Sequence, residues 1–481
     1  MTRYTELSII EINKLLKNKE IKPIDLVLET FEKIESSNIN AFITLNKEEA
    51  INKAIELENK EVDNIMFGIP IAIKDNIITK NLKTTCASRM LEDFIPIYDA
   101  TVINKIKEKN MIIIGKTNMD EFAMGSTGET SYFGATLNPW DSTVVPGGSS
   151  SGSAASVSSG LSIVALGSDT GGSIRQPSSF CGVVGMKPTY SRVSRYGLVA
   201  FASSLDQIGP ISRTVMENAL LLNVISGYDE NDLTSSKKEV IDYTRLINKG
   251  IKGLKIAVPN YYMADTINSE VRNSVRKVID ILKDEGCTVE NIDIDYLDYA
   301  IPLYQVIALA EASSNLARFD GIRFGYVSSN FTNVEELYKN TRSEGFGNEV
   351  KRRLMIGSYV LSGDNAHKYY EKALLLRREM ANALKKVFEK YDLIIGPTNT
   401  DVAYPFGTKI DDALKSFYDD LLTIPVNMAG LPAMSMPVGF KSNLPIGLHI
   451  IGNYFKEDVM YQLGHFIENK LKLHLKPGGE K

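Results

Sequence analysis

Between Pro146 and Arg175 the chain carries two serine- and glycine-rich segments that enclose an apolar run. The stretch reads PGGSSSGSAASVSSGLSIVALGSDTGGSIR and contains no aromatic residue. Its middle, residues 161–167, is apolar and of strand length, and residues 154–157 favour a short helix before it. A solvated linker would lack such a middle. The pattern predicts two loops around a buried helix and strand, in which glycine lets backbone amides approach a ligand and serine supplies nucleophilic hydroxyls.

The composition is that of a globular protein with a large core. The 481 residues are 43% hydrophobic and 23% charged, which provides ample apolar surface to bury. Length alone suggests about three domains, but strand-length apolar segments occur in both halves and no repeat or composition break divides them. We therefore expect an α/β fold with one large mixed β-sheet that is covered by helices on both faces.

The charge and the cysteines argue against several classes of protein. The net charge is −5 and no long basic block occurs, so the surface is not built on average to hold nucleic acid by counterion release. The cysteines, Cys86, Cys181 and Cys287, are isolated, which argues against a zinc site or a disulfide framework. Because the N-terminus lacks a signal-peptide pattern and no apolar run of about 18 residues occurs, we expect a cytoplasmic protein with no membrane partner.

Hydrophobic periodicity predicts the elements on either side of the opening stretch. A helix is expected over residues 7–19, a second begins at Pro23, and a third follows the strand at 41–45 and ends at about residue 60. Further helices are expected over 101–109, 214–226, 268–286, 299–316, 347–360, 364–390 and 456–470. Strands are expected at residues 41–45, 69–74, 111–116, 254–258, 288–294, 393–395 and 445–451, and buried sheet over 422–437. Residues 203–210 and 321–345 are expected to form loops.

The glycine-rich segments do not match the phosphate-binding motifs, since neither G-x-x-x-x-G-K-[ST] nor G-x-G-x-x-G occurs in them. Residues 148–152 do match the G-x-S-x-G elbow of serine esterases, with Ser150 at the centre. That elbow needs a strand leading into it and a downstream histidine, whereas Pro146 and a loop-like segment precede the match. The histidines that follow it are His367, His449, His465 and His474. His449 lies in an apolar strand, which favours core packing, and an esterase using Ser150 and His449 stays an alternative.

Lys74 offers another way to activate a serine. It ends a run of isoleucines, so we expect it to emerge from a buried strand. A lysine acts as a base only when it is neutral, and burial lowers its pKa from about 10.4 in that direction. The alternative is a structural lysine that pairs with Asp75.

Three separated motifs then carry a resemblance. They are Gly68-Ile-Pro-x-x-x-Lys74-Asp, Pro146-Gly-Gly-Ser149-Ser150 and Gly167-Ser-Asp169-Thr-Gly-Gly-Ser173-Ile-Arg175-x-Pro177. In the order and the spacing of these motifs, the sequence resembles the amidase signature family. The catalytic triad of that family is Ser-cisSer-Lys. The resemblance implies the fold of that family, with a single amidase domain over residues 1–481. Within it, N-terminal helices would cover 1–60, the signature core 65–215, and the rest of the sheet, the substrate pocket and the C-terminal helix 216–481.

The same resemblance implies roles for individual residues. Ser173 would be the nucleophile, Ser149 the bridging cis-serine and Lys74 the base. Asp169 and Arg175 would support the loops and the network around the lysine; they would also fit an ordinary structural ion pair. The oxyanion hole would consist of the backbone amides of Thr170, Gly171, Gly172 and Ser173.

Further segments are similar to the A (glutaminase) subunits of glutamyl-tRNA(Gln)/aspartyl-tRNA(Asn) amidotransferases. They are residues 181–189, 192–198, 205–210, 311–321 and 422–432. This resemblance implies that Arg353 pairs with the α-carboxylate of glutamine, that Asp420 pairs with its α-ammonium, and that Tyr304 lines the pocket. One departure is Ser151, which stands where the family usually has glycine.

The implied function is hydrolysis of glutamine, with ammonia passed to a partner for the amidation of misacylated tRNA. The partners would be the B and C subunits, and ATP and magnesium would act at the partner subunit, because no ATP or metal motif occurs in this chain. Two other possibilities are a stand-alone amide hydrolase of the same family and a non-catalytic scaffold. The choice between Glu-tRNA(Gln) and Asp-tRNA(Asn) is not determined by the sequence.

Overall fold

The computed structural model describes residues 4–408, 418–473 and 477 of the chain. In these residues the strands form one mixed sheet of 11 strands, in the order β1-β3-β2-β4-β6-β5-β10-β11-β9-β7-β8. The strands are β1 (Phe42–Leu45), β2 (Pro70–Lys74), β3 (Ile112–Thr117), β4 (Val164–Asp169), β5 (Val184–Lys187), β6 (Gln207–Ser212), β7 (Lys255–Pro259), β8 (Thr288–Ile292), β9 (Leu393–Pro397), β10 (Ala433–Lys441) and β11 (Leu444–Gly452). The expected fold class is confirmed.

Helices cover this sheet. The α-helices are α1 (Ile9–Lys17), α2 (Pro23–Glu35), α3 (Lys47–Leu57), α4 (Thr101–Glu108), α5 (Ser151–Ser158), α6 (Arg175–Cys181), α7 (Val215–Ile225), α8 (Ser269–Asp284), α9 (Ala300–Asn315), α10 (Val334–Gly345), α11 (Asn348–Leu361), α12 (Glu371–Val387), α14 (Ile424–Ala429) and α15 (Glu457–Leu471). Short helical turns are η1 (Tyr4–Glu6), η2 (Arg89–Leu91), η3 (Glu121–Ala123), η4 (Asn260–Met263), η5 (Leu297–Tyr299), η6 (Leu316–Arg318) and the π-turn η7 (Ala366–Tyr370).

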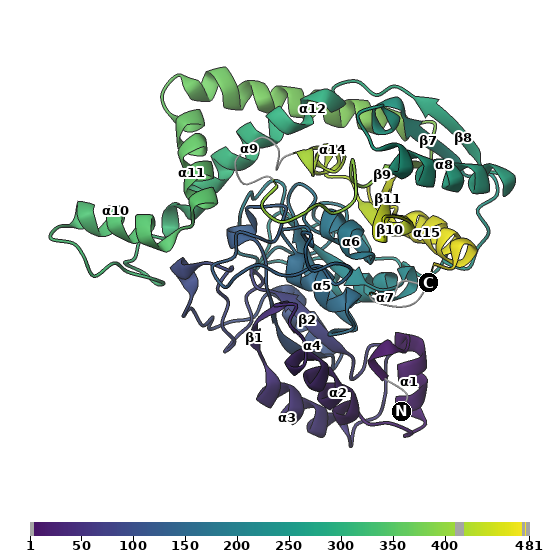
Figure 1. The fold of residues 1–481 in the computed structure, drawn as a ribbon, viewed down its shortest axis with the longest axis horizontal. Helices are drawn as coiled ribbons and strands as arrows, with labels where there is room; N and C mark the ends of the chain where they lie inside the picture. Colours follow the sequence, from purple (N-terminus) through teal and green to yellow (C-terminus); the bar gives the residue numbers. More distant parts are fainter. Residues whose placement is uncertain (1–3, 409–417, 474–476, 478–481) are drawn as a thin grey trace.

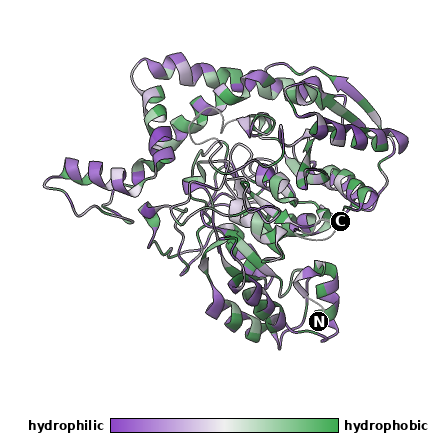
Figure 2. Ribbon diagram, viewed as in Figure 1, coloured by the Kyte–Doolittle hydropathy of each residue, from purple (hydrophilic) through white to green (hydrophobic). Residues whose placement is uncertain are grey.

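Alternation along the central strands divides the core between the two faces of the sheet. Ile71 and Ile73 of β2 belong to the hydrophobic cluster that includes residues of α1, α4 and α7. Ala72, between them, belongs to a second cluster with residues of α2, α3 and α5. Successive side chains of a strand point to opposite faces, so both faces must be covered. Figure 2 shows the central strands in green and the outer helices banded in purple and green, as expected for this arrangement.

Parallel pairing in the centre of the sheet decides where the site can form. Strand β2 lies between β3 and β4 and is parallel to both, so the three carboxyl ends meet at one edge. In open α/β sheets, ligands bind at this edge. The pairing of β4 with β6 is antiparallel, as is that of β10 with β11. Helices α9, α11, α12 and α14 lie together beyond this part of the sheet, and α10 projects from the body (Figure 1).

One local expectation is confirmed as predicted and another is confirmed with shifted bounds. Ser8 and Glu11 form the predicted capping box at the start of α1, and this pair of hydrogen bonds satisfies amides that the helix leaves free. The strand expected at 161–167 is displaced toward the C-terminus and forms β4. Because of this shift, Asp169 ends the strand and the glycines that follow it form the next loop.

Three expectations were wrong. The loop expected over 203–210 contains the start of β6, which pairs with β4 on one side and β5 on the other. The loop over 321–345 ends in α10, whose first turn is capped by the Asn333 side chain. The buried sheet expected over 422–437 begins with α14 instead, because Pro425 suits a first helical turn and Gly430, at φ +70°, ends it.

Replacing Gly357 with alanine is expected to lower the free energy of unfolding by about 1–2 kcal/mol. An ideal Cβ at Gly357, in α11, would lie 1.9 Å from the carbonyl oxygen of Leu309 in α9. The resulting overpacking outweighs the gain of about 1 kcal/mol that alanine brings to a helix. Urea unfolding measures the change, with Gly250→Ala as the control, since no described atom lies within 4 Å of a Cβ there. An equal or greater stability of Gly357→Ala would contradict the packing of α9 on α11.

Candidate active site

The carboxyl end of β2 places Lys74 at the centre of the site. Its amino nitrogen lies 2.8 Å from Ser149 Oγ, 2.9 Å from Ser150 Oγ and 2.9 Å from Ser168 Oγ. Asn76 Nδ2 donates to Ser168 Oγ at 2.9 Å and holds that hydroxyl in place. The end of β2, the end of β4 and the loop before α5 thus converge on one amine.

Lys74 does not pair with Asp75, which was the structural alternative. The Asp75 carboxylate accepts a hydrogen bond from the backbone amide of Thr85 at 2.9 Å. Its cationic neighbour is Lys116, at 3.7 Å. Asp75 follows the last residue of β2, where the chain turns, and its carboxylate contacts Thr85 and Lys116 and not the Lys74 amine.

Complete burial sets the protonation of Lys74. The residue is 0% exposed, and the contacts of its amine are to hydroxyl and carbonyl oxygens. Burial lowers the pKa of Lys74 to about 7, although the carboxylates of Asp120, Asp169 and Asp206 act in the opposite direction. A substantial fraction of the amine is therefore neutral at neutral pH, as a general base must be.

Ser149 lies in a tightly constrained loop. The Gly148–Ser149 peptide bond is cis, and the Ser149 carbonyl accepts a hydrogen bond from the Asp120 amide at 3.2 Å. An ideal Cβ at Gly148 would lie 1.9 Å from Asp120 Oδ2, so only glycine fits there. Among the described residues, the Ser149 hydroxyl bonds to Lys74 and makes no hydrogen bond to Ser173.

Ser150 is a neighbour of the lysine and not an esterase nucleophile. Its hydroxyl contacts Lys74 and donates to the Ser168 carbonyl at 3.1 Å. The segment before it is irregular, so the strand that an elbow needs is missing. His449 is engaged elsewhere, and His474 lies outside the described residues. Ser151 begins α5 and has helical backbone, so the usual glycine is not required at this position.

Ser173 ends a loop whose carbonyls and side chains are anchored at several points. Thr170 Oγ1 donates to Asp206 at 2.7 Å, and the Gly171 carbonyl accepts from Thr423 Oγ1 at 2.7 Å. No hydrogen bond among the described residues uses the amides of Gly171, Gly172 or Ser173 as a donor. These amides are thus available to an oxyanion, and one such donor lowers an acyl-transfer barrier by about 3–4 kcal/mol.

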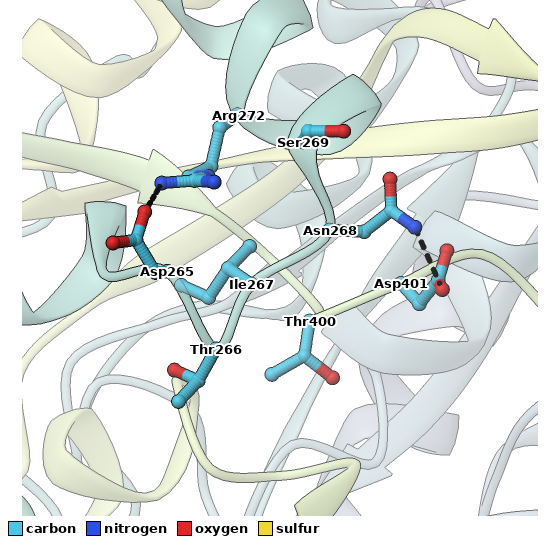
Figure 3. Close-up of a pocket in the computed structure, with 8 residues that line it drawn as sticks. All are labelled: Asp265, Thr266, Ile267, Asn268, Ser269, Arg272, Thr400 and Asp401. Carbon is cyan, nitrogen blue, oxygen red and sulfur yellow. Dashed lines mark hydrogen bonds and ion pairs between the residues drawn. The ribbon is translucent and has the colours of Figure 1, made fainter.

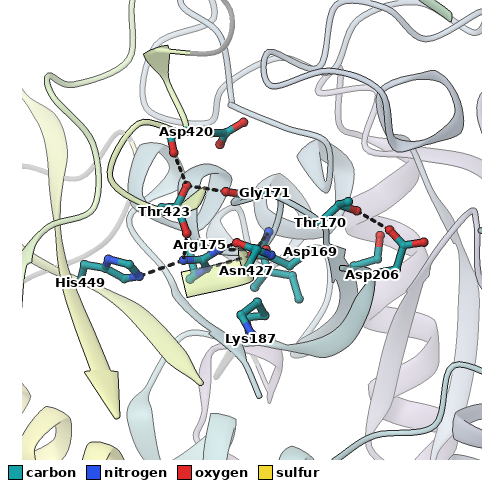
Figure 4. Close-up of polar contacts among 12 residues, drawn as sticks. Asp169, Thr170, Gly171, Arg175, Lys187, Asp206, Asp420, Thr423, Asn427 and His449 are labelled. Atoms are coloured by element: carbon teal, nitrogen blue, oxygen red, sulfur yellow. Dashed lines mark hydrogen bonds and ion pairs between the residues drawn. The ribbon is translucent and has the colours of Figure 1, made fainter. Parts of the chain in front are cut away.

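The buried ion pair of Asp169 and Arg175 connects the two ends of this loop. Arg175 Nε and Nη2 donate to the two oxygens of Asp169 at 3.0 and 2.9 Å, and both side chains are completely buried. Its remaining donors reach Thr423 O, His449 Nε2 and Asn427 Oδ1. Figure 4 shows this guanidinium at the centre of the network. All five N–H groups are used, which makes the buried charge tolerable.

The electrostatic consequences are clear for both partners of Arg175. Burial by itself would raise the pKa of Asp169, but the guanidinium holds it at about 2. His449 Nε2 faces an N–H donor, so it accepts and the ring is neutral. Burial and the nearby Arg175 lower the pKa of His449 well below its usual range. His449 therefore cannot serve as the base of an esterase.

The residues expected to bind glutamine surround the same loop. An ideal Cβ at Gly171 would lie 2.8 Å from Tyr304 Cε2, and one at Gly172 would lie 2.4 Å from Asp420 Oδ1. That Asp420 oxygen is buried and has no hydrogen-bond partner in the described residues. Burial raises the pKa of Asp420 well above its usual range, and the Asp419 and Asp169 carboxylates act in the same direction. A cation placed there would restore its charge.

The structure also distinguishes between neighbouring residues of the same type, for which the sequence offered no choice of substrate ligand. The Arg353 side chain is 5% exposed, against 28% for Arg352. Arg353 lies over the Phe201 ring at 5.9 Å, and its Nε donates to Glu349 at 2.7 Å. Asp419 already accepts hydrogen bonds from Tyr404 and Ser126. These contacts favour Arg353 and Asp420 as ligands of the substrate.

The profile of the Amidase family matches residues 25–460 of the chain. The chain belongs to the amidase family. It is 53% identical over 478 residues to the glutamyl-tRNA(Gln) amidotransferase A subunit of Pediococcus pentosaceus, with 98% of each chain covered. Identity to the protein of that name from Staphylococcus epidermidis is 54% over 473 residues, covering 97% of this chain and 98% of the relative. The solved structure of the glutamyl-tRNA(Gln) amidotransferase A subunit from Thermotoga maritima matches with a TM-score of 0.81 and 43% identity, over 99% of this chain and 96% of that one.

Several residues of this amidase site were not singled out from the sequence. They are Asn76, Ser168, Asp206, Thr423 and Asn427. The last three lie inside segments that carried the resemblance, so their positions had a signal although their contacts did not. Ser168 lies inside the third motif and Asn76 directly follows the first, but nothing in their local pattern predicts their contacts.

A separate surface hollow of about 440 Å3 is lined by residues other than Lys74, Ser149 and Ser173. Figure 3 shows its lining, in which Asp265 pairs with Arg272 and Asn268 donates to Asp401 at 3.1 Å. Its charged groups thus all have polar partners, and the ion-pair partner of Asp401 is Lys441. Within residues 4–408, 418–473 and 477, no cluster of three or more potential metal ligands occurs. None of the helices in that part of the chain is sufficiently long and apolar to span a bilayer.

The reactivity of Ser173 toward a sulfonyl fluoride is expected to rise with pH through about 7, where Lys74 becomes neutral. The sign follows from the lowered lysine pKa, because the base is protonated and inactive below it and neutral above it. The rate should change about tenfold per pH unit on the acid limb and then level off. Labelling rates measured from about pH 5.5 to about pH 9 test this. Lys74→Arg, which stays protonated, should be unreactive throughout; a wild-type rate that does not vary with pH would refute the role of Lys74.

Proposed function

We propose that this chain is the glutaminase subunit of a tRNA-dependent amidotransferase. It would hydrolyse glutamine and supply ammonia for the conversion of Glu-tRNA(Gln) to Gln-tRNA(Gln), of Asp-tRNA(Asn) to Asn-tRNA(Asn), or of both. The observation that carries the proposal is the 2.8 Å contact between the buried Lys74 amine and Ser149, beside a nucleophile loop with free amides. The identity of 53–54% to amidotransferase A subunits, over nearly the whole chain, supports this function over that of a stand-alone amide hydrolase.

The acylation step follows from the arrangement of the three residues. Neutral Lys74 takes the proton of Ser149, which takes that of Ser173 as the Ser173 oxygen bonds to the amide carbon of glutamine. The Ser149 and Ser173 hydroxyls make no mutual hydrogen bond in the described residues, so rotation of Ser173 toward Ser149 completes the relay when substrate binds. The carbonyl oxygen becomes an oxyanion at the amides of residues 170–173.

The second half of the reaction runs the relay in reverse. The amide nitrogen takes the proton returned through Ser149, the C–N bond breaks, and ammonia leaves. Water then attacks the glutamyl ester on Ser173, and Ser149 and Lys74 take its proton and return it to Ser173 Oγ as the ester bond breaks and glutamate leaves. The burial of this site suits the retention of ammonia until it reaches an acceptor.

Glutamine would be recognised at both of its charged groups. Its ammonium would pair with Asp420, whose Oδ1 has no other partner in the described residues. Its carboxylate would pair with Arg353, a planar donor suited to that group. Tyr304, 4% exposed, would line the pocket between them.

Assembly with other subunits completes the proposal. The B and C subunits would receive the ammonia and contact the misacylated tRNA, consistent with the mild net charge of −5 of this chain. We place ATP and magnesium at the partner subunit, where the tRNA-bound carboxylate must be activated before ammonia can attack. The compartment that we expect for this assembly is the cytoplasm.

Ser173→Ala is expected to reduce glutaminase activity at least about a thousandfold, because the nucleophile is lost. Ser150→Ala should retain a glutamyl ester on Ser173, detectable by mass spectrometry of quenched enzyme. Both variants are measured in the full chain with and without co-purified B and C subunits. Full loss in Ser150→Ala and His449→Ala, with activity kept in Ser173→Ala, would point to the esterase mechanism instead.

Asp420→Asn is expected to raise the KM for glutamine about 10- to 100-fold, because a charge-assisted hydrogen bond contributes about 1.5–3 kcal/mol. The turnover number should change much less, since the ammonium is remote from the reacting bond. Asp419→Asn is the matched control, because that carboxylate already binds Tyr404 at 2.6 Å. Equal effects of the two substitutions on KM would contradict the assignment of Asp420.

A further inference from the structure

Two successive buried acids, Asp120 and Glu121, connect the loop that carries Ser149, here called the serine loop, with a helix from the other half of the chain. The Asp120 amide donates to the Ser149 carbonyl at 3.2 Å. The Glu121 carboxylate accepts the backbone amide of Gly347 with its two oxygens, at 2.9 and 3.2 Å. Gly347 immediately precedes α11, 226 residues further along the chain.

Glu121 is held in an enclosed environment. Its side chain is 3% exposed and also accepts a hydrogen bond from Ser88 Oγ. The following residue, Phe122, packs edge-on against Phe346 with ring centroids 5.6 Å apart. Phe122 has φ +50° and Ala123 has φ +61°, a region that residues with side chains rarely adopt. Backbone of this kind persists where its surroundings hold it, and it is common near functional sites.

The contact of Glu121 with Gly347 caps α11. An ideal Cβ at Gly347 would lie 2.3 Å from Glu121 Oε2, so glycine permits the close approach. Gly347 is the N-cap of α11 and provides no side-chain cap of its own. The Glu121 carboxylate accepts the amide of the N-cap residue, as the acid of a capping box does, and interacts favourably with the helix dipole.

Helix α11 carries Arg353 into the substrate pocket. Arg353 lies less than two turns beyond Gly347, and Glu349 of the first turn accepts from Arg353 Nε at 2.7 Å. Four residues beyond Arg353, α11 is packed against the Leu309 carbonyl through Gly357. These contacts hold α11 on both sides of Arg353, and the contact at its N-terminal end is that of Glu121.

We propose that Glu121 is a positioning residue for glutamine: through Gly347 it sets the position of α11, and thereby that of Arg353, relative to the serine loop. Asp120 anchors one side of the dipeptide to Ser149, and Glu121 anchors the other side to the substrate helix. The inference rests on the proposed function, since it takes Arg353 as the ligand of the glutamine carboxylate. Loss of the anchor should weaken recognition of that carboxylate and leave the chemistry at Ser173 intact.

Glu121→Gln tests this in the full chain co-purified with its partner subunits. It is expected to raise the KM for glutamine at least tenfold, with kcat changed less than threefold. The KM for 4-aminobutanamide, which is glutamine without the α-carboxylate, should stay within twofold of wild type. Arg353→Met should show the same selectivity, and the double variant should be no worse than Arg353→Met alone.

Glu217→Gln is the matched control. Glu217 is also a buried carboxylate, 2% exposed, that accepts a backbone amide from a distant segment, Ile9 at 3.3 Å. It anchors α7 to α1, so it should leave both KM values unchanged. Gly347→Ala provides a second test that pushes the same contact apart, and it should reproduce the glutamine-specific rise in KM.

The outcomes separate the two hypotheses. Wild type that prefers glutamine over 4-aminobutanamide, with Glu121→Gln and Gly347→Ala both unchanged or impaired equally on the two substrates, would overturn the role of Glu121 and leave the proposed function standing. Wild type that does not discriminate between the two substrates would overturn the glutamine site itself, and the role of Glu121 with it.

Discussion

The burial of one amine governs the rest of this structure. Lys74 is 0% exposed and contacts hydroxyl and carbonyl oxygens, with no carboxylate bonded to it among the described residues. Desolvation penalises the ammonium form, so the site maintains a base near neutral pH without a histidine. Such burial requires that β2 lie inside the sheet, and β3 and β4 flank it on its two sides.

A second buried charge is treated in the opposite way. Arg175 keeps its charge because Asp169 and three further acceptors satisfy every N–H group. The network reaches α14 through Asn427 and β11 through His449, and it therefore holds the nucleophile loop against the C-terminal half of the sheet (Figure 4). The network of Arg175 anchors the loop on one side, and the amides of residues 171–173 donate to no group among the described residues.

The two halves of the chain meet at this loop, and each contributes a different function. The serine loops and Lys74 come from the first half, whereas Tyr304, Arg353 and Asp420 come from the second. Glycine at positions 171 and 172 allows Tyr304 and Asp420 to lie within contact distance of the loop backbone. The contact of Glu121 with Gly347 ties the start of α11 to the segment that bonds the Ser149 carbonyl.

Local pattern was sufficient for much of the fold. The isoleucine runs of β2 and β3, the periodic helices and the capping box of α1 have strong short-range signals, and the structure contains them. The pattern failed where long-range pairing or a cap decides the outcome. Strand β6 has no distinctive sequence and exists because β4 and β5 pair with it, and α14 lies in an apolar segment that hydrophobicity alone cannot distinguish from a strand.

The sequence by itself determined the motifs, their order and the chemical types at the site: a lysine after a buried strand, serines in glycine-rich loops, and an arginine with acids farther on. Only the tertiary structure decided which of these groups meet. It turned Lys74 toward Ser149 and Asp75 toward Lys116, distinguished Arg353 from Arg352 by burial, and left Asp420 without the partners that Asp419 has. The physical reason is that desolvation and hydrogen-bond satisfaction depend on neighbours that lie hundreds of residues away in the chain, and no local pattern records them.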